Sequence, residues 1–527
     1  MINMRKYLFV IGGVMSGLGK GILSASTALL FSSLGYNVSM LKADPYINLD
    51  AGTMNPYQHG EVYVTEDGGE TDLDIGHYER FLNKNLHKWN NITSGKIYYS
   101  VIEKEREGKY LGQTVQIIPH VTDEIKSSIK EVGEKDGAEV LVIELGGTVG
   151  DIEGLPFLEA ARQMYLESRD DVAFILLGLV PLSLDQEQKT KPLQHSVQEL
   201  RRIGIQPTVI VGRSEKPLTP EAKQKLSLYS NLPQEGIFSD PDLDSPYELP
   251  IVLEDEGYLN YLLRALSLKE AKPDLSALKD FISRMKSYKE IKKVAMVGKY
   301  TKVTDSYISI KESLKIAGAY AGVKPEFVWI ESTDIEEGKT DVESLEFEAA
   351  VVLPGFGARG VEGKIKALKR LREKNVPTLG ICYGLQLMTV EIARNVLGLN
   401  GAHTTEVDPN TPYPVVDLME EQKKVLKIGG TMRLGSYPLY LVKGSLAYKA
   451  YGKESTFERH RHRYEINNKY LEKFESAGYV ASGYSVGSII EIMEYKINKF
   501  FIGTQFHPEF NSKLFSPHPL FIELLRQ

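Results

Sequence analysis

The chain has a single cysteine, Cys382, among its 527 residues. One thiol excludes an intrachain disulfide framework and any zinc or iron–sulfur site built from several cysteines. No apolar run approaches the roughly 18 residues that a membrane span requires, and the apolar stretch in MINMRKYLFVIGG is too short for a secretory signal. We therefore expect a cytoplasmic protein without membrane contact, in which Cys382 either fills the core or reacts.

Net charge and repetition are also scarce. The formal net charge of -7 is mild for this length, so electrostatics gives no reason to expect nucleic-acid binding. We find no repeat, low-complexity tract or heptad run, which argues against solenoids and coiled coils. The 42% of hydrophobic and 25% of charged residues favour a soluble globular protein, and the length suggests two or more domains.

Short apolar runs bounded by turn residues recur through the first half. They span 7–11, 38–41, 140–145, 173–180 and 208–211, and their lengths are typical of buried parallel strands. Segments such as 21–34 and 122–132 have amphipathic helical spacing between them. This alternation predicts an α/β domain with a mostly parallel sheet over residues 1–266.

The sequence changes character over residues 267–293, a lysine-rich, weakly helical stretch that we interpret as an interdomain linker. Strand-like runs then resume at 294–297, 327–330, 349–353, 378–381 and 500–505. We therefore predict a second α/β domain over residues 294–527, different in kind from the first.

The first predicted strand runs directly into GGVMSGLGKG, and a predicted helix follows. Glycine-rich backbone can surround phosphates with N–H groups, the helix N-terminus adds positive potential, and Lys20 supplies a mobile cation. The match to G-x-x-x-x-G-K-[ST] is imperfect, because five residues separate Gly13 from Gly19 and Gly21 stands where a magnesium-binding hydroxyl belongs. The alternative is a glycine turn that merely joins strand to helix.

Without a hydroxyl at position 21, Mg²⁺ would need other oxygen ligands. Asp74 lies in the acidic segment TEDGGETDLDIGHYERF, and Glu144 ends the apolar strand VLVIEL. Each carboxylate alone reads as a surface charge or a helix cap. Glu144, however, ends its strand at the edge where open α/β sheets bind ligands, which favours a site.

Four stretches resemble the amidoligase domain of the CTP synthase family: GGVMSGLGKG, KADPYINLDAGTMNPYQHGEVYVTEDGGETDLDIGHYERF, IELGGTVGDIEGLPFLEAARQ and KTKPLQHSVQELRRIGIQP. The resemblance implies a P-loop-type, Rossmann-like domain in which Asp74 and Glu144 hold Mg²⁺ and Lys20 and Lys42 support phosphoryl transfer. It implies an ATP site formed by Gly17, Leu18, Gly19, Lys20, Gly21, Ile22, Asp74, Arg213, Pro241, Asp242 and Leu243. It implies a site for UTP, or for CTP as feedback inhibitor, formed by Ser16, Asp151, Ile152, Glu153, Lys189, Thr190, Lys191, Pro192, Leu193, Gln194 and Lys225. Without the resemblance, KTKP reads as an exposed loop.

In the second half, the strand 378–381 runs directly into Cys382, Tyr383 and Gly384, and a helical pattern follows. Such a strand-to-helix elbow presents a side chain at the carboxyl edge of the sheet, and the helix N-terminus favours the thiolate over the thiol. A lone cysteine after an apolar strand is otherwise read as core filling.

Two further features favour a reactive Cys382. His507 and Glu509 follow the strand 500–505, so a base lies near an acceptor that can fix its tautomer. The turn PGFG at 354–357 follows the strand AAVVL, and its N–H groups could stabilise an oxyanion by about 3 kcal/mol per donor. Alone, His507 reads as a satisfied loop histidine.

Together these features resemble the triad glutaminase domain of class I amidotransferases. The resemblance implies that Cys382 attacks the glutamine amide, His507 transfers protons and Glu509 orients His507. It implies an oxyanion hole lined by Gly355 and Tyr383 and a glutamine site formed by Gly355, Tyr383, Gly384, Leu385, Gln386, Glu406 and Arg463. Many CTP synthases carry PGGFG where this chain has PGFG, so the resemblance does not fix the oxyanion donor.

The basic run RHRHRYE at 459–465 could indicate nucleic-acid binding. The run is short, the protein is acidic and no aromatic residues interleave the arginines. We instead expect this segment to face the active site and the domain junction, as the family resemblance implies.

Taken together, the two resemblances imply an ATP-driven enzyme that aminates UTP to CTP with nitrogen from glutamine. Because a pyrimidine O4 is a poor leaving group, phosphorylation by ATP and Mg²⁺ would activate it for displacement by ammonia. Ammonia is mostly protonated in neutral water, so we expect an internal passage from Cys382 to the phosphate loop. The family further implies activation by GTP, inhibition by CTP and a homotetramer.

Three other classes remain open at this point. The chain could be another glutamine-dependent P-loop amidoligase, of the cobyrinate or biotin-precursor type, although KTKPLQ and GGTVGDIEG argue against this. A partitioning-type P-loop switch would leave the second half unexplained. A regulatory protein with an inactive glutaminase domain would not need Cys382, His507 and Glu509.

Overall fold

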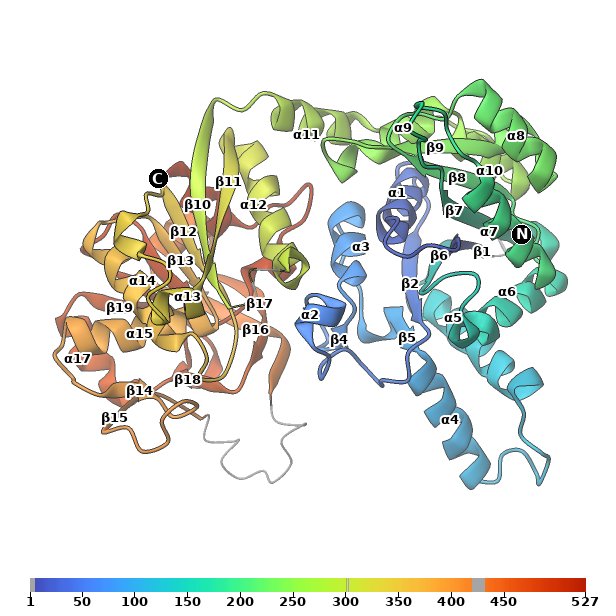
Figure 1. Ribbon diagram of the computed structural model, residues 1–527. Coiled ribbons are helices and arrows are strands. Elements are labelled where there is room, and N and C mark those ends of the chain that lie inside the picture. The colour runs from blue at the N-terminus through green and yellow to red at the C-terminus, as the bar shows by residue number, and fades with distance from the viewer. Residues whose placement is uncertain (1–4, 300, 302, 419–431) are drawn as a thin grey trace. The chain divides into compact units, whose positions relative to one another are not determined.

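The computed structural model describes residues 5–299, 301, 303–418 and 432–527. They divide into two compact units, drawn in Figure 1. The first unit comprises Met1–Thr53 and Asp74–Ile282, and the second comprises Met54–Leu73 and Ser283–Gln527. Each unit is described by itself.

The described part of the first unit is built on a seven-stranded sheet in the order β5-β2-β6-β1-β7-β8-β9, with every ladder parallel. This confirms the predicted α/β class. The strands are β1 (Lys6–Gly12), β2 (Val38–Asp44), β5 (Asn91–Thr93), β6 (Val140–Leu145), β7 (Val172–Leu179), β8 (Val209–Ser214) and β9 (Ile237–Pro241). Since parallel strands end at the same edge, the residues after them gather there.

The helices of this unit cover both faces of the sheet, which is why the middle strands are apolar throughout. Phe9 and Ile11 of β1 belong to one buried cluster, whereas Leu8 and Val10 are buried on the opposite face. The helices are α1 (Lys20–Ser32), α3 (Asp74–Leu82), α4 (Ser94–Arg106), α5 (Thr122–Lys135), α6 (Leu155–Glu167), α7 (Lys191–Arg202), α8 (Pro220–Ser230), α9 (Leu249–Asp255), α10 (Tyr258–Ala265) and α11 (Ser276–Lys286).

The segment predicted as a linker, 267–293, contains more regular structure than its sequence indicated. Leu278, Phe281 and Ile282 of α11 are buried, and the Phe281 ring packs against Tyr247 with centroids 5.6 Å apart. The compact units divide after Ile282, and the next strand already begins at Glu290. The functional domain limits 1–266, 267–293 and 294–527 stay a prediction.

The second unit is built on a sheet whose nine strands, among the residues described, run in the order β11-β10-β12-β13-β21-β20-β19-β16-β17. The first five are parallel and the rest are joined by antiparallel ladders. They are β10 (Glu290–Gly298), β11 (Val323–Glu331), β12 (Ala349–Val352), β13 (Thr378–Ile381), β16 (Arg433–Leu441), β17 (Ser455–His462), β19 (Tyr479–Tyr484), β20 (Ile490–Tyr495) and β21 (Phe501–Thr504).

Helices cover both faces of this sheet as well, as its two buried clusters indicate. One cluster includes α14 (Val361–Glu373) and α15 (Tyr383–Asn395). The other includes α12 (Ile308–Ala321) and α18 (Pro519–Arg526). The unit also contains β14 (Ala402–Thr404), β15 (Tyr413–Leu418) and β18 (Tyr464–Ile466), with α13 (Ser332–Glu336), α16 (Leu446–Tyr451) and α17 (Leu471–Ser476).

One segment of the amino-terminal half belongs to the second unit. Residues Met54–Leu73 form α2 (Pro56–His59) and a hairpin of β3 (Tyr63–Val64) and β4 (Glu70–Thr71). The sequence did not predict this assignment. Among the described residues, no helix combines the length and apolarity needed to cross a membrane.

Candidate active site

The glycine-rich loop joins β1 to α1, as predicted. Gly17 and Gly19 have φ angles of 73° and 93°, a left-handed conformation that glycine adopts without strain. Gly19 is the residue before α1, and the loop from Val14 to Gly17 is exposed. Exposed backbone at a helix N-terminus is suited to binding phosphate.

Lys20 is the first residue of α1, and its ammonium donates to the carbonyl of Gly147 at 2.7 Å. Gly147 follows β6, so the lysine links two neighbouring strand ends. Burial lowers the pKa of Lys20 from its usual value, and the charge of Glu144 opposes this. A long side chain with one hydrogen bond to a loop carbonyl can turn toward an anionic ligand.

Gly21, the departure from the phosphate-loop pattern, lies against Asp74. A Cβ atom at position 21 would lie 2.1 Å from Asp74 Oδ1. The carboxylate therefore occupies the space that a serine or threonine side chain would fill. Asp74 begins α3, and the glycine is what allows it to approach the loop.

Lys42 joins the two predicted magnesium ligands. Its ammonium hydrogen-bonds Asp74 and donates to Glu144 Oε1 at 2.7 Å, with Asp44 Oδ1 3.9 Å away. The Tyr78 hydroxyl also donates to Glu144. Burial alone would raise the pKa of Asp74, but Lys42 and His77 hold it at about 2. Burial and then the charge of Asp74 raise the pKa of Glu144.

These residues fit a magnesium ion bound together with phosphates. Asp74 and Glu144 converge on one ammonium, with Asp44 adding a further carboxylate, so the cluster has more acidic groups than Lys42 can neutralise. No described group of three or more His, Cys, Asp or Glu side chains is arranged to hold a metal by itself. Mg²⁺ commonly takes one or two carboxylates and completes its shell with water and phosphates.

The other predicted nucleotide residues also follow strands of the parallel sheet. Glu187 forms ion pairs with Lys189 at 2.6 Å and Lys225 at 3.3 Å, which brings these two lysines together. At the ends of β8 and β9, Arg213 pairs with Asp242 at 2.6 Å. Their position is the edge where open α/β sheets bind ligands.

The predicted UTP contacts Asp151, Ile152 and Leu193 differ in how far their side chains are accessible to a ligand. Asp151 accepts a hydrogen bond from the Thr148 N–H at 2.6 Å, whereas Ile152 is 80% exposed. Leu193 is buried in the hydrophobic core beside Gly178. Only the main chain of Leu193 is therefore free to meet a ligand.

In the second unit, Cys382 lies in a strained elbow between β13 and α15. Its φ and ψ are 51° and -101°, a conformation that costs a residue with a side chain on the order of 1–3 kcal/mol. Gly384 makes the elbow possible, because a Cβ there would lie 2.3 Å from the carbonyl oxygen of Val352. Strain concentrated at the one cysteine argues against simple core filling.

His507 and Glu509 follow β21, the strand beside β13, and are paired as predicted. His507 Nδ1 lies 2.7 Å from Glu509 Oε1, and both side chains are buried. Burial lowers the pKa of His507, but the charges of Glu509 and Cys382 outweigh it and raise the pKa to about 10. Nε2 has no hydrogen-bond partner of normal geometry in the described structure, and catalytic contacts are often looser without substrate.

The turn 354–357 follows β12, next to the elbow, and three side chains hold it. Glu406 accepts from the Gly357 N–H at 2.6 Å, the Tyr383 hydroxyl donates to the Gly357 carbonyl at 2.9 Å, and Lys299 donates to the Phe356 carbonyl. Burial raises the pKa of Glu406. The shortened PGFG turn is therefore held in one conformation by side chains of the same unit.

A buried lysine lies under this turn. Lys364 of α14 is 1% exposed and donates to the Leu353 carbonyl at 2.7 Å. Its ammonium is 5.4 Å from the centre of the Tyr383 ring, and burial lowers the pKa of Lys364 to about 7. Sequence analysis did not single it out.

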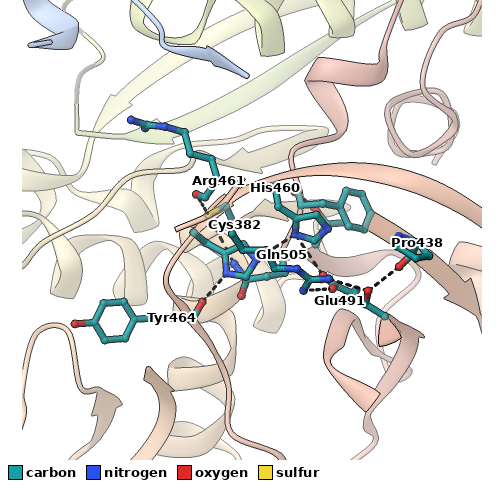
Figure 2. A network of polar contacts seen from close by, with 12 residues as sticks. Cys382, Pro438, His460, Arg461, Tyr464, Glu491 and Gln505 are labelled. Carbon is teal, nitrogen blue, oxygen red and sulfur yellow. Dashed lines mark hydrogen bonds and ion pairs between the residues drawn. The ribbon is translucent and has the colours of Figure 1, made fainter. Parts of the chain in front are cut away.

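The Arg461 carbonyl and the Gln505 side chain contact the thiol, and Gln386 lies next to Gln505. Figure 2 shows Cys382 between the Arg461 carbonyl, 3.8 Å from Sγ, and the Gln505 amide nitrogen, 3.7 Å from Sγ. Gln386 Nε2 donates to the Tyr464 carbonyl at 2.9 Å, and its buried Oε1 has no partner among the described residues. An unsatisfied buried oxygen beside a nucleophile is suited to a substrate amide.

The other predicted glutamine contacts, Arg463, Glu406 and Leu385, differ in whether their side chains are available to a ligand. Arg463 interacts electrostatically with Glu406, so these two predicted residues lie near each other. Leu385 is fully buried in the core, against Gly503. Its side chain packs the sheet, and only its main chain could contact a ligand.

The arginine and histidine run 459–462 lies on β17 and is largely internal. Arg459, His460 and His462 are buried, and burial lowers the pKa of His462 to about 3. His460 lies 3.7 Å from Glu491, to the right of Cys382 in Figure 2. Buried side chains cannot form the exposed basic patch that nucleic acid would require.

Sequence reasoning missed Lys299, Lys364 and Gln505. Lys299 directly follows β10 and Gln505 directly follows β21, so their positions at strand ends were a usable signal. Lys364 lies at helical spacing from Val361 and Leu368, on the apolar face of α14, so that spacing was a usable signal for it.

Comparisons with known proteins match the two halves of the chain to two family models. Residues 6–268 match the family model described as CTP synthase N-terminus, and residues 302–527 match Glutamine amidotransferase class-I. A CTP synthase of Aeropyrum pernix is 58% identical over 98% of this chain and 97% of its own length. One from Sulfurisphaera tokodaii is 56% identical over 99% of both chains. The glutaminase domain of a Trypanosoma brucei CTPS with bound acivicin is 31% identical, covers 44% of this chain and 91% of its own, and has a TM-score of 0.41.

The parallel-sheet nucleotide unit and the Cys-His-Glu elbow define a glutamine amidotransferase joined to a P-loop-type synthase. Two family models and the full-length relatives identify the particular family. The chain belongs to the CTP synthase family.

Proposed function

We propose that this protein converts UTP to CTP with ATP as co-substrate and glutamine as nitrogen donor. The observation that carries the proposal is that a member of this family has both the Cys382 elbow with a His507–Glu509 pair and a phosphate loop in the same unit as the Lys42, Asp74 and Glu144 cluster. Each is a site for one half of the reaction.

In the glutaminase half, the Cys382 thiolate attacks the side-chain amide carbon of glutamine. Protonated His507, oriented by Glu509, donates a proton to the leaving nitrogen, and ammonia departs from a thioester. Water then attacks the thioester with His507 as base, which releases glutamate. N–H groups of Gly355 and Tyr383 stabilise the oxyanion in both steps.

Glutamine is held in this proposal by Gly355, Tyr383, Gly384, Leu385, Gln386, Glu406 and Arg463. The unpaired Oε1 of Gln386 supports its part. The hydrogen bond from Gly357 to Glu406 supports an additional role for Glu406, which is to keep the oxyanion turn in place.

In the synthase half, the γ-phosphoryl group of ATP passes to O4 of UTP, and ammonia then displaces phosphate at C4. Asp74 and Glu144 would hold Mg²⁺ with the nucleotide phosphates, and the ion would neutralise charge on those phosphates. Lys20 and Lys42 place ammonium groups beside the same phosphates. The excess of carboxylates around Lys42 supports this assignment.

The nucleotides occupy the carboxyl edge of the parallel sheet in this proposal. ATP contacts Gly17 to Ile22, Arg213 and Pro241 to Leu243. UTP, or CTP as inhibitor, contacts Ser16, Asp151 to Glu153, Lys189 to Gln194 and Lys225. The pairing of Lys189 and Lys225 through Glu187 supports a shared anion site, because both ammonium groups are available to a triphosphate that displaces the carboxylate. We further propose activation by GTP, a homotetramer and a cytoplasmic location, on the family resemblance alone.

The test is CTP formation by the purified protein. UTP, ATP and Mg²⁺ are mixed with glutamine or with ammonium chloride, and the ultraviolet change from uracil to cytosine is followed. Cys382→Ala should abolish the glutamine reaction and keep the ammonia reaction. If the folded wild-type protein makes no CTP from either donor, the proposal is wrong; if Cys382→Ala loses both reactions while folded, the proposed division of labour is wrong.

A further inference from the structure

Arg459 and Arg461, two residues of β17, contact the proposed glutaminase triad through their main-chain carbonyls. The carbonyl of Arg461 lies 3.8 Å from Cys382 Sγ, and the carbonyl of Arg459 accepts the His507 N–H at 2.8 Å. Both arginines are on β17, two positions apart, so their side chains leave the same face of the strand. The alternate residues His460 and His462 are on the other face.

The side chains of both arginines bind the hairpin formed by residues 63–71. Arg459 is fully buried, and its guanidinium donates to the Tyr63 hydroxyl at 3.3 Å and the Val64 carbonyl at 3.1 Å. Arg461 Nε donates to Glu70 Oε1 at 2.8 Å. The alternation of arginine and histidine in RHRHRYE thus separates a hairpin-binding face from a core face.

The hairpin also reaches His507 from a second direction. The Tyr63 hydroxyl donates to the Phe510 carbonyl at 3.0 Å, and the two rings pack edge to face with centroids 4.9 Å apart. The Phe510 ring in turn stacks on His507, with centroids 5.0 Å apart and planes at 13°. The imidazole is therefore packed against a ring that Tyr63 holds.

The hairpin is firmly seated against the second unit. Tyr63, Val64 and Thr71 are buried, and the Ser436 N–H donates to the Glu66 carbonyl at 2.9 Å. A Cβ at Gly435 would lie 2.7 Å from the Gly68 nitrogen, so the backbones of hairpin and β16 are in close contact. These contacts leave the hairpin few other positions against β16.

We propose that hairpin 63–71, supplied by the amino-terminal half of the chain, is a positioning element of the glutaminase site. Glu70 fixes Arg461, whose carbonyl contacts the Cys382 thiol, and Tyr63 fixes Arg459 and Phe510, which hold His507. Neither Glu70 nor Tyr63 touches glutamine in this scheme. The inference rests on the proposed glutaminase function and adds to it residues from outside the glutaminase half.

The test uses Glu70→Gln and Tyr63→Phe in the full-length protein. Glu70→Gln removes the charge that pairs with Arg461, and Tyr63→Phe removes the hydroxyl that bonds both Arg459 and Phe510. Both substitutions keep the side-chain size. Because displacement of a reacting group by about 1 Å can cost about 100-fold, we expect a partial displacement to lower kcat for glutamine hydrolysis about 10-fold. KM for glutamine and CTP formation from ammonium chloride should stay at wild-type values. Alkylation of Cys382 by iodoacetamide should slow in Glu70→Gln, which a purely structural role would not predict.

A matched control is Glu454→Gln, which breaks the exposed 2.6 Å ion pair with Lys443 in the same unit and should leave both activities unchanged. The proposal is overturned if Glu70→Gln and Tyr63→Phe hydrolyse glutamine at the wild-type rate, or if their ammonia-dependent activity falls in parallel. A wild-type protein that makes no CTP from either donor would instead refute the proposed function itself.

Discussion

Restoring the usual phosphate-loop residue at position 21 should damage the enzyme. In Gly21→Ser the new Cβ would lie 2.1 Å from Asp74 Oδ1 and 2.8 Å from Cγ. The carboxylate must retreat by about 1 Å, and at a reacting centre such a shift costs about 100-fold in rate. A hundredfold loss corresponds to about 2.7 kcal/mol of transition-state stabilisation. Lys42 keeps its contact with Glu144, so the fold should survive.

The assay is CTP formation from ammonium chloride, which bypasses the triad, with glutamine hydrolysis by the same preparation as an internal reference. Gly154→Ser is the matched control, because Gly154 also has helical backbone angles and a Cβ there would meet nothing within 4 Å. Synthase activity of Gly21→Ser at the wild-type level would refute the view that Asp74 replaces the missing hydroxyl.

Three further predictions concern the second unit. The alkaline limb of kcat/KM for glutamine should lie near pH 10, because the raised pKa of His507, about 10, keeps the imidazolium beside the thiolate. Glu509→Gln should move that limb to lower pH. A limb that does not move would contradict the assignment of the alkaline limb to His507. The same raised pKa means that this interaction stabilises the fold fully below about pH 6.5 and is lost as pH rises through about 10. Gly384→Ala should lower the free energy of unfolding by about 3 kcal/mol, measured by urea denaturation, since its Cβ would lie 2.3 Å from the Val352 carbonyl; an unchanged midpoint would show that the elbow can relax. Burial lowers the pKa of Lys364 from 10.5 to about 7, so the folded protein binds fewer protons than the unfolded chain between those values and gains stability as pH rises. Thermal melts at pH 6 and pH 9 should therefore show a larger gain for wild type than for Lys364→Met, and equal gains would place the titration elsewhere.

The sequence was most informative where local pattern and structure coincide. The apolar runs 140–145 and 378–381 coincide with β6 and β13, because a buried parallel strand is apolar from end to end. The triad pairing of His507 with Glu509 was predicted for a similar reason, since two residues just beyond one strand are close in any fold.

Features that depend on distant partners were not predictable in this way. Strand β16 contains Gly435 and Pro438, residues that argue against a strand locally, yet β17 and β19 pair with it on its two sides. The clash that keeps position 21 a glycine involves Asp74, which approaches only in the folded chain.

The two units are interlaced rather than consecutive. The chain leaves the first unit after Thr53, contributes Met54–Leu73 to the second and returns at Asp74, the predicted magnesium ligand. Only Asp72 and Leu73 separate β4 from Asp74 along the chain. Gene fission or domain transplantation that cuts only near residue 282 would therefore leave the hairpin on the amino-terminal fragment. A working split protein would have to supply residues 54–73 to the carboxyl-terminal fragment.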